Sequence, residues 1–206
     1  MNKSLNKALI NKAQVHLKAS DGILSGLIER YGPCMIRPEL DDPFHALASS
    51  IISQQLSARA ARAIKSRLLN LLGADRLTPE HVLEMPVKYF RAAGLSRAKS
   101  GYIQGIAWAV KKGDLDFPVI ASSEDEDVIA KLIGLPGIGR WTAEMFLIFG
   151  LGRPDVLSVS DAGLKRALKL AYKLRETPSP DKMISIGEPW KPYRSVASWY
   201  LWRTID

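Results

Sequence analysis

Cysteine and histidine are scarce in this chain, which limits the metal chemistry open to it. Cys34 is the single cysteine among 206 residues, so an internal disulfide is excluded, as is a zinc or iron–sulfur centre held by several thiolates. The three histidines, His16, His45 and His81, stand far apart and fit no histidine-ligated metal site. We expect each of them at the surface or at a helix cap.

Long apolar runs are missing as well. No stretch reaches the roughly 20 apolar residues that a membrane-spanning helix needs, and residues 1–7 carry charge with no apolar core behind them. We therefore expect no membrane segment and no secretory signal. The expected location is the cytosol or the chromosome, which means the nucleus in a eukaryote.

Basic residues outnumber acidic ones. The chain has 29 Lys and Arg against 21 Asp and Glu, a formal net charge of +8. This excess favours a polyanionic partner such as nucleic acid. The 47% hydrophobic content predicts an ordinary globular protein, folded as one domain or as two closely joined lobes.

The chain is rich in helix signals and has almost no strand signals. Asp42 followed by Pro43 is an acidic cap with proline in the first turn, and it predicts a helix over residues 44–53. Periodicity or a cap signal marks the other expected helices, at residues 5–18, 22–31, 57–72, 97–111 and 162–172, with shorter ones opening near 78, 86 and 122. No repeat or low-complexity linker divides them, so a compact all-α protein is predicted.

The most informative motif occupies residues 135–143 and reads Leu-Pro-Gly-Ile-Gly-Arg-Trp-Thr-Ala. One apolar helical face precedes it, marked by Val128, Ile129, Leu132 and Ile133, and a second follows over residues 141–149. A glycine pair between helices is most often a plain turn. In this basic chain we favour a second interpretation, in which Gly137 and Gly139 let a phosphate approach main-chain N–H groups.

A lone acid, Asp161, lies beyond the next apolar stretch. It has two interpretations that can both hold. One is an N-cap for the helix over residues 162–172, worth about 1 kcal/mol. The other is a carboxylate that performs chemistry, whose negative charge the positive end of that helix would favour.

These residues resemble the helix-hairpin-helix DNA glycosylase superfamily, and more narrowly its alkylation-repair branch, of the DNA-3-methyladenine glycosylase II type. The hairpin and Asp161, within Val-Ser-Asp-Ala-Gly-Leu-Lys at 159–165, carry the resemblance. Supporting matches follow in the expected order, at residues 44–57, 93–99 and 191–195 and at Trp199 and Trp202. The resemblance covers about residues 43–202 and points to the compact form, without an additional N-terminal α/β domain.

The resemblance implies two helical lobes with the active-site cleft between them. One lobe would comprise approximately residues 1–42 plus 153–206, and the other approximately residues 43–152. Relatives often hold a monovalent cation on hairpin carbonyls, here those of Leu135 and Ile138, which would take Na⁺ or K⁺. No other cofactor is implied, and the expected state is a monomer on double-stranded DNA.

The implied activity is that of a monofunctional glycosylase in base excision repair. It would flip out an alkylated base, such as 3-methyladenine or 7-methylguanine, and hydrolyse the N-glycosidic bond to leave an abasic site. Asp161 would stabilise the positive charge that develops on the sugar and help to orient the water. Relatives that also cut the backbone carry a lysine where this chain has Trp141, and indole cannot form a Schiff base.

The resemblance assigns further residues to the base and to the DNA backbone. Trp141 and Trp202 match aromatic positions that line the base pocket and would stack on a cationic base; Met145 and Gln54 are placed in the same pocket. Gln55, with Leu56 beside it, would fill the gap left by the flipped nucleotide. The backbone contacts would come from Gly137, Ile138, Gly139, Arg140, Thr142, Arg97 and Lys99. For Trp108, Trp190 and Trp199 we expect core packing.

Two other classes of function stay open on the sequence. A non-catalytic helix-hairpin-helix module would bind DNA by shape and charge, and it would need neither Asp161 nor an aromatic pocket. A glycosylase for oxidised or mismatched bases would need specific hydrogen-bonding side chains in place of stacking. Release of free base from methylated duplex DNA separates the three.

Overall fold

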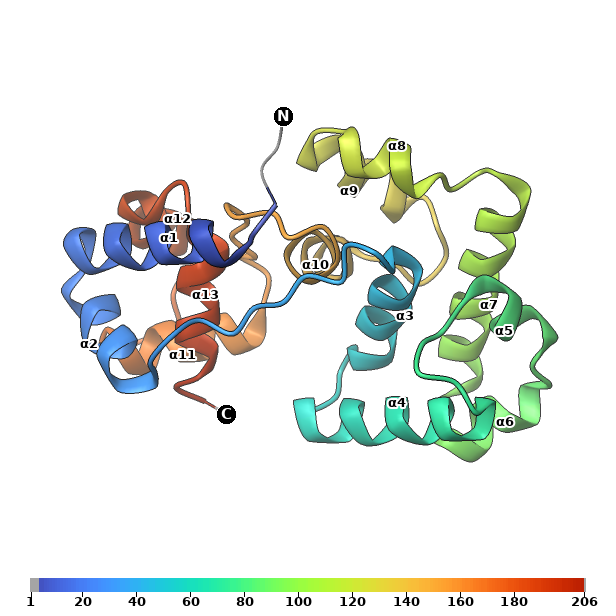
Figure 1. Cartoon of the computed structure of the whole chain (residues 1–206). Helices are drawn as coiled ribbons and strands as arrows, with labels where there is room; N and C mark the ends of the chain where they lie inside the picture. Colours follow the sequence, from blue (N-terminus) through green and yellow to red (C-terminus); the bar gives the residue numbers. More distant parts are fainter. Residues whose placement is uncertain (1–3, 206) are drawn as a thin grey trace. The chain divides into compact units, whose positions relative to one another are not determined.

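The computed structural model of the chain describes residues 4–205 (Figure 1). Residues 1–3 and 206 lie outside the described part. The expected absence of a secretory signal and the bounds of the first expected lobe both involve some of these residues. The described residues form helices and turns without a strand, which confirms the predicted all-α class. In this part of the chain, no helix combines the length and the apolar character that spanning a bilayer requires.

The described residues group into two compact units. Unit 1 contains Glu39–Phe146. Unit 2 is built from two separate stretches of chain, the described residues of Asn2–Pro38 and of Leu147–Asp206. Each unit buries its own set of apolar side chains, so each is described by itself.

Unit 1 is a cluster of helices around α7 (Figure 1). Its helices are α3 (Pro43–Ser53), α4 (Ala58–Leu72), α5 (Pro79–Glu84), α6 (Val87–Ala93), α7 (Arg97–Lys112), α8 (Phe117–Ser122), α9 (Asp125–Ile133) and α10 (Arg140–Met145). Helix α7 packs against α3, α5 and α6, and α3 also contacts α4 and α10. The largest buried side chains include Leu47, Ile51, Leu68, Phe90 and Ile103. Their burial removes apolar surface from water and is the main force that holds these short helices together.

Unit 2 is organised around its last helix. Its helices are α1 (Lys7–Ser20), α2 (Gly22–Tyr31), α11 (Ala162–Ala171), α12 (Pro180–Gly187), the 3₁₀ turn η2 (Glu188–Trp190) and α13 (Arg194–Trp202). Helix α13 contacts α1, α2 and α11. The π-helical turn η1 (Phe146–Gly150) carries the chain from unit 1 into unit 2.

Trp190 and Cys34 are two of the buried side chains of unit 2. Trp190 is fully buried and donates its Nε1–H to Asp21 Oδ2 at 2.9 Å, which confirms its predicted core position. Cys34 is also buried, and burial raises the pKa of its thiol to about 11. The thiol is therefore protonated at neutral pH, which disfavours a nucleophilic role.

Side-chain hydrogen bonds cap the starts of most described helices, and the caps at Asp42 and Asp161 were predicted. The Asp42 carboxylate accepts the His45 N–H at 3.2 Å with Pro43 in the first turn, as predicted. Ser57 Oγ accepts the Ala60 N–H at 3.2 Å and begins α4. Helices α8 and α12 were not predicted, although Asp116 and Ser179 cap them in the same way and proline occupies their first turn.

Several burial predictions were wrong. Trp108 is 51% exposed instead of packed in the core, because it lies on the outer face of α7, where Lys111 Nζ sits 5.4 Å from its ring centroid. Trp199 is half-buried. Ile133 is 45% exposed although its helical neighbours are buried, because it is the last residue of α9 and the chain turns away there.

His45 is buried, contrary to the predicted surface or capping position. Its Nδ1 accepts the Leu77 N–H at 2.9 Å, so the neutral ring carries its proton on Nε2. Burial lowers the pKa of His45 below its usual value of 6.5. The charged groups near the ring have opposite effects on the pKa of His45. Glu39 and Asp42 raise it, and Lys65 and Arg76 lower it.

The lowered pKa of His45 predicts a loss of stability in acid. Below pH 6.5 the unfolded chain protonates this histidine while the folded protein resists protonation, so the free energy of unfolding falls as pH drops from 6.5 toward the folded-state pKa. The slope contributed by this group is at most about 1.4 kcal/mol per pH unit. His45→Asn retains an acceptor near the position of Nδ1 and does not titrate. Denaturant unfolding at pH 7.5 and pH 5.5 should show a smaller loss for His45→Asn than for the wild type, and equal losses would contradict this assignment.

Candidate functional site

The glycine motif forms the link between two helices of unit 1. Helix α9 ends at Ile133 and α10 begins at Arg140. Within the link the Leu135 carbonyl accepts the Ile138 N–H at 3.2 Å, which closes a turn, and Gly137 has φ +81°. The predicted tight connection between helices is therefore present.

Gly137 is required by a close contact as well as by its backbone angle. A Cβ placed on it would lie 2.1–2.5 Å from ring atoms of Tyr102, which projects from α7. Gly139 differs: its φ is −95°, and a Cβ there would have no described atom beyond its chain neighbours within 4 Å. The Tyr102 contact was not anticipated, because a tyrosine on an amphipathic helix carries no sequence signal for packing on a distant glycine.

The two glycines should respond differently to alanine. Gly137→Ala must relieve the overlap with Tyr102 and adopt a left-handed conformation, which costs about 1–2 kcal/mol before the overlap is counted. Gly139→Ala adds a methyl group in open space at a helix N-cap and should cost less than about 1 kcal/mol. Chemical denaturation of both variants measures the difference. Equal stability losses would contradict the close packing at Gly137.

Gln54 joins this link to the loop between α3 and α4. Its Nε2 donates to the Gly137 carbonyl at 2.8 Å and to Thr142 Oγ1 at 2.9 Å. The sequence placed Gln54 in the base pocket, and the structure engages its amide with the hairpin of the same unit. One side chain thus connects the end of α3 to the turn and to the start of α10.

Lys99 supports the same loop from the start of α7. Its Nζ donates to the carbonyls of Ile52 (2.9 Å) and Gln54 (2.5 Å), at the C-terminal end of α3. A cation at this position satisfies carbonyl groups that the helix leaves without partners. Burial lowers the pKa of Lys99. Lys99 was assigned to the DNA backbone together with Arg97; in this structure the Lys99 ammonium group holds the α3–α4 loop, and Arg97 is exposed.

Gln55 stands at the tip of the α3–α4 loop in an uncommon conformation. Its φ is +57°, the left-handed region that residues other than glycine rarely adopt. Its side chain is exposed, and Leu56 beside it is 39% exposed. Uncommon backbone angles persist where surrounding contacts enforce them, and the hydrogen bonds of Gln54 and Lys99 do so here.

At the start of α10, Arg140 is paired with carboxylates of its own unit, and two neighbouring side chains are buried. Arg140 donates to both carboxylate oxygens of Glu126, at 3.1 and 2.5 Å, and from Nε to Glu144 at 3.1 Å. These carboxylates raise the pKa of the Arg140 guanidinium and balance its charge. Ile138 and Thr142 have buried side chains, so a DNA strand could meet them only through their main chain.

The two residues of α10 assigned to the base pocket differ in exposure. Met145 is 6% exposed, whereas Trp141 is half-buried. Trp141 therefore presents part of its indole at the surface of unit 1, and Met145 lies mostly inside it.

Asp161 and Trp202 meet in unit 2. Asp161 is the N-cap of α11, where its Oδ1 accepts the Leu164 N–H, and the same oxygen accepts the Trp202 Nε1–H at 3.0 Å. The predicted capping role is confirmed. Asp161 is 8% exposed, and the Trp202 ring lies 5.9 Å from the ring of Phe149, centroid to centroid.

Gly163 makes room for this pair. A Cβ on Gly163 would lie 3.2 Å from Asp161 Oδ1 and 3.7 Å from Trp202 Cδ1. The Ala-Gly sequence that follows Asp161 therefore leaves the carboxylate and the indole side by side. Among the described residues, no group of three or more His, Cys, Asp or Glu is arranged to hold a metal ion.

The chain matches a known protein family. Residues 48–192 match the family described as HhH-GPD superfamily base excision DNA repair protein. The match includes the α3–α4 loop, the glycine hairpin and Asp161.

Proteins similar to this chain include two from fission yeast and one from a bacterium. The alkylbase DNA glycosidase-like protein mag2 of Schizosaccharomyces pombe is 31% identical, over 93% of this chain and 92% of its own length. The 3-methyladenine DNA glycosylase Mag1 of the same yeast, solved in complex with abasic DNA, is 32% identical with a TM-score of 0.85, over 94% of this chain and 96% of that one. A DNA-3-methyladenine glycosidase of Bacillus halodurans is 41% identical with a TM-score of 0.73, over 93% and 88%.

Proposed function

Because the chain belongs to the HhH-GPD superfamily of base excision DNA repair proteins, we propose that it is a monofunctional DNA glycosylase for alkylated bases of the 3-methyladenine type. In this reaction the bond between C1′ and the base nitrogen breaks, and the base leaves with the electron pair. Water forms the new bond to C1′ and loses a proton. The products are a free base and an abasic site.

The arrangement around Asp161 carries the proposal. Its carboxylate is nearly enclosed, and two N–H donors, from Leu164 and from the Trp202 indole, fix its orientation. A fixed negative charge needs no reorganisation when positive charge develops on a sugar, and this preorganisation is a main source of electrostatic catalysis. We assign to Asp161 the stabilisation of that charge and the orientation of the attacking water.

The proposed base pocket relies on aromatic faces. A base methylated on a ring nitrogen carries positive charge, and an indole attracts a desolvated cation by about 1–2 kcal/mol. Trp202, beside Asp161 in unit 2, and the half-exposed Trp141 of unit 1 are each proposed as stacking surfaces, and Met145 and Gln54 of unit 1 are assigned to the base as well. Trp141 also occupies the position at which lyases carry their lysine, and indole cannot form the covalent intermediate.

We assign the grip on double-stranded DNA to unit 1. Flipping a nucleotide costs a few kcal/mol of stacking and pairing, which contacts to the backbone and a side chain that fills the gap must offset. Gln55 is the proposed filling side chain, because its strained backbone presents an exposed side chain at a loop tip. The main chain around Gly137 and Gly139 is the proposed phosphate contact.

A monovalent cation on the hairpin carbonyls stays part of the proposal. The Leu135 carbonyl accepts one N–H and keeps a second lone pair, so with Ile138 it fits a weakly held Na⁺ or K⁺. The Gly137 carbonyl is already engaged by Gln54. Such an ion would fix the link without entering the reaction.

Asp161→Asn tests the chemistry directly. Asparagine is also a good N-cap, so the variant should fold and should still bind duplex DNA that contains an abasic site. Loss of the negative charge should slow release of 3-methyladenine from methylated duplex DNA by about 100-fold or more. The measurement is chromatography of the free base in single-turnover reactions.

Asp116→Asn is the matched control for this variant. Asp116 is the solvent-exposed N-cap of α8 and accepts the Val119 N–H at 3.1 Å. Asp116→Asn therefore makes the same chemical change as Asp161→Asn, also at a helix N-cap. It should leave base release unchanged. Full activity of Asp161→Asn would disprove the assigned mechanism, and a wild type that binds DNA but releases no base would identify a non-catalytic binding module.

Gly139→Ala tests the phosphate contact without disturbing the fold. Its added methyl group points into open space at the hairpin, where a DNA backbone would approach, so affinity for abasic duplex DNA should fall several-fold. Gly105→Ala, at an exposed position of α7 with equal room for a Cβ, should leave affinity unchanged. Fluorescence anisotropy measures both, and equal affinities would remove Gly139 from the interface.

A further inference from the structure

Helix α4 is strongly basic, and part of its charge lies in the first turns. It holds Arg59, Arg62, Lys65 and Arg67 and has no acidic residue. Positive side chains in the first turns of a helix oppose the helix dipole. Arg67 has a structural partner, since its Nε donates to the Ala93 carbonyl at 2.9 Å. For Arg62, the described residues provide neither a hydrogen-bond nor an ion-pair partner.

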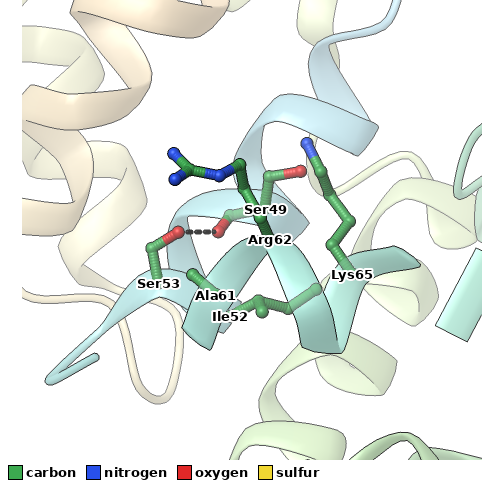
Figure 2. Close-up of a pocket in the computed structure, with 6 residues that line it drawn as sticks. All are labelled: Ser49, Ile52, Ser53, Ala61, Arg62 and Lys65. Atoms are coloured by element: carbon green, nitrogen blue, oxygen red, sulfur yellow. Dashed lines mark hydrogen bonds between the residues drawn. The ribbon is translucent and has the colours of Figure 1, made fainter. Parts of the chain in front are cut away.

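Arg62 and Lys65 border a hollow between α3 and α4, shown in Figure 2. Its volume is about 170 Å³, and its lining consists of Ser49, Ile52, Ser53, Ala61, Arg62 and Lys65. Among these described lining residues there is no carboxylate. A second hollow of about 260 Å³ shares both cations and continues along α4 as far as Asp75.

A buried hydroxyl in this hollow is without a partner. Three serines follow one another closely on α3, and two of them bond back to their own helix: Ser50 Oγ donates to the Ala46 carbonyl at 3.0 Å, and Ser53 Oγ to the Ser49 carbonyl at 2.8 Å. Ser49 Oγ is buried, and among the described residues it has no hydrogen-bond partner. Buried polar atoms are rarely left unpaired in native proteins, so this hydroxyl is expected to find its partner when a ligand enters the hollow and the side chain turns toward it.

We propose that this hollow seats a backbone phosphate of the DNA, as a second contact in unit 1 besides the hairpin. The inference rests on the proposed function and names a part of its interface. A phosphate accepts hydrogen bonds only, and the hollow offers it a guanidinium, an ammonium and a hydroxyl. The hollow lies on the two helices that flank the Gln55 loop, so the phosphate would belong to the backbone near the flipped nucleotide.

Charge removal at the hollow tests the proposal. Arg62→Gln combined with Lys65→Gln should weaken binding to abasic duplex DNA about tenfold or more, and should reduce the slope of log affinity against log salt by at least about 1. Lys88→Gln combined with Arg91→Gln is the matched control, because it removes one lysine and one arginine with the same spacing from the exposed face of α6. Anisotropy titrations at several NaCl concentrations give both quantities.

Ser49→Ala gives a second test that does not change the charge. It should weaken DNA binding about two- to tenfold, as for the loss of one hydrogen bond. Stability should not fall, because the hydroxyl has no partner among the described residues. Thermal unfolding and the same anisotropy titration separate the two effects.

The results that would overturn the proposal are distinct from a failure of the proposed function. Unchanged affinity and salt slope in the Arg62/Lys65 variant, or an equal loss in the Lys88/Arg91 control, would show that the hollow contacts no phosphate of DNA. Stabilisation of the wild type by inorganic phosphate, with DNA affinity unaffected in the variant, would assign the hollow to a free anion instead. Base release at saturating DNA should persist in the variant. A wild type that releases no base would refute the enzymatic activity alone.

Discussion

The side-chain amide of Gln54 is the contact on which the arrangement of unit 1 depends. It holds the hairpin at Gly137 and Thr142, while its own carbonyl is held by Lys99. Tyr102, on the same helix as Lys99, packs on Gly137 from another direction. The loop that presents Gln55 and the hairpin are therefore parts of one hydrogen-bonded structure. A DNA strand that contacts one of them meets the other at a set distance, which is the preorganisation that an enzyme acting on a flipped base requires.

Asp161, to which we assign the chemistry, also serves the stability of unit 2. As an N-cap it satisfies an N–H of α11, and as the acceptor of the Trp202 indole it is tied to α13, the last helix of the chain. The same two bonds orient the carboxylate. Arg62 of helix α4 shows the opposite relation, because it lies in the first turns, opposes the helix dipole and has no hydrogen-bond or ion-pair partner among the described residues. Local conflicts of this kind are expected where function constrains a sequence.

The sequence predicts best those features that depend on residues close together in the chain. Asp42, Ser57 and Asp161 each cap the helix that the sequence predicts, because a capping bond spans only three residues. Errors arose where burial depends on distant packing. His45 is buried where its ring accepts the N–H of Leu77, 32 residues away in the chain, and Trp108 is exposed because α7 turns its other face to the core. Periodicity defines a face, but it does not say which face a neighbouring helix will cover.

The amino-acid sequence by itself determined the helical class, the glycine link, the cap at Asp161 and the family to which these residues belong. Each depends on residues close together in the chain or on a motif in a recognisable order. Tertiary structure alone decided that Gln54 and Lys99 hold a loop, that Arg140 pairs with Glu126, and that Ser49 faces a hollow beside two cations. The residues of each group come from separate elements, and only the packing of α3, α4, α7, α9 and α10 brings them together.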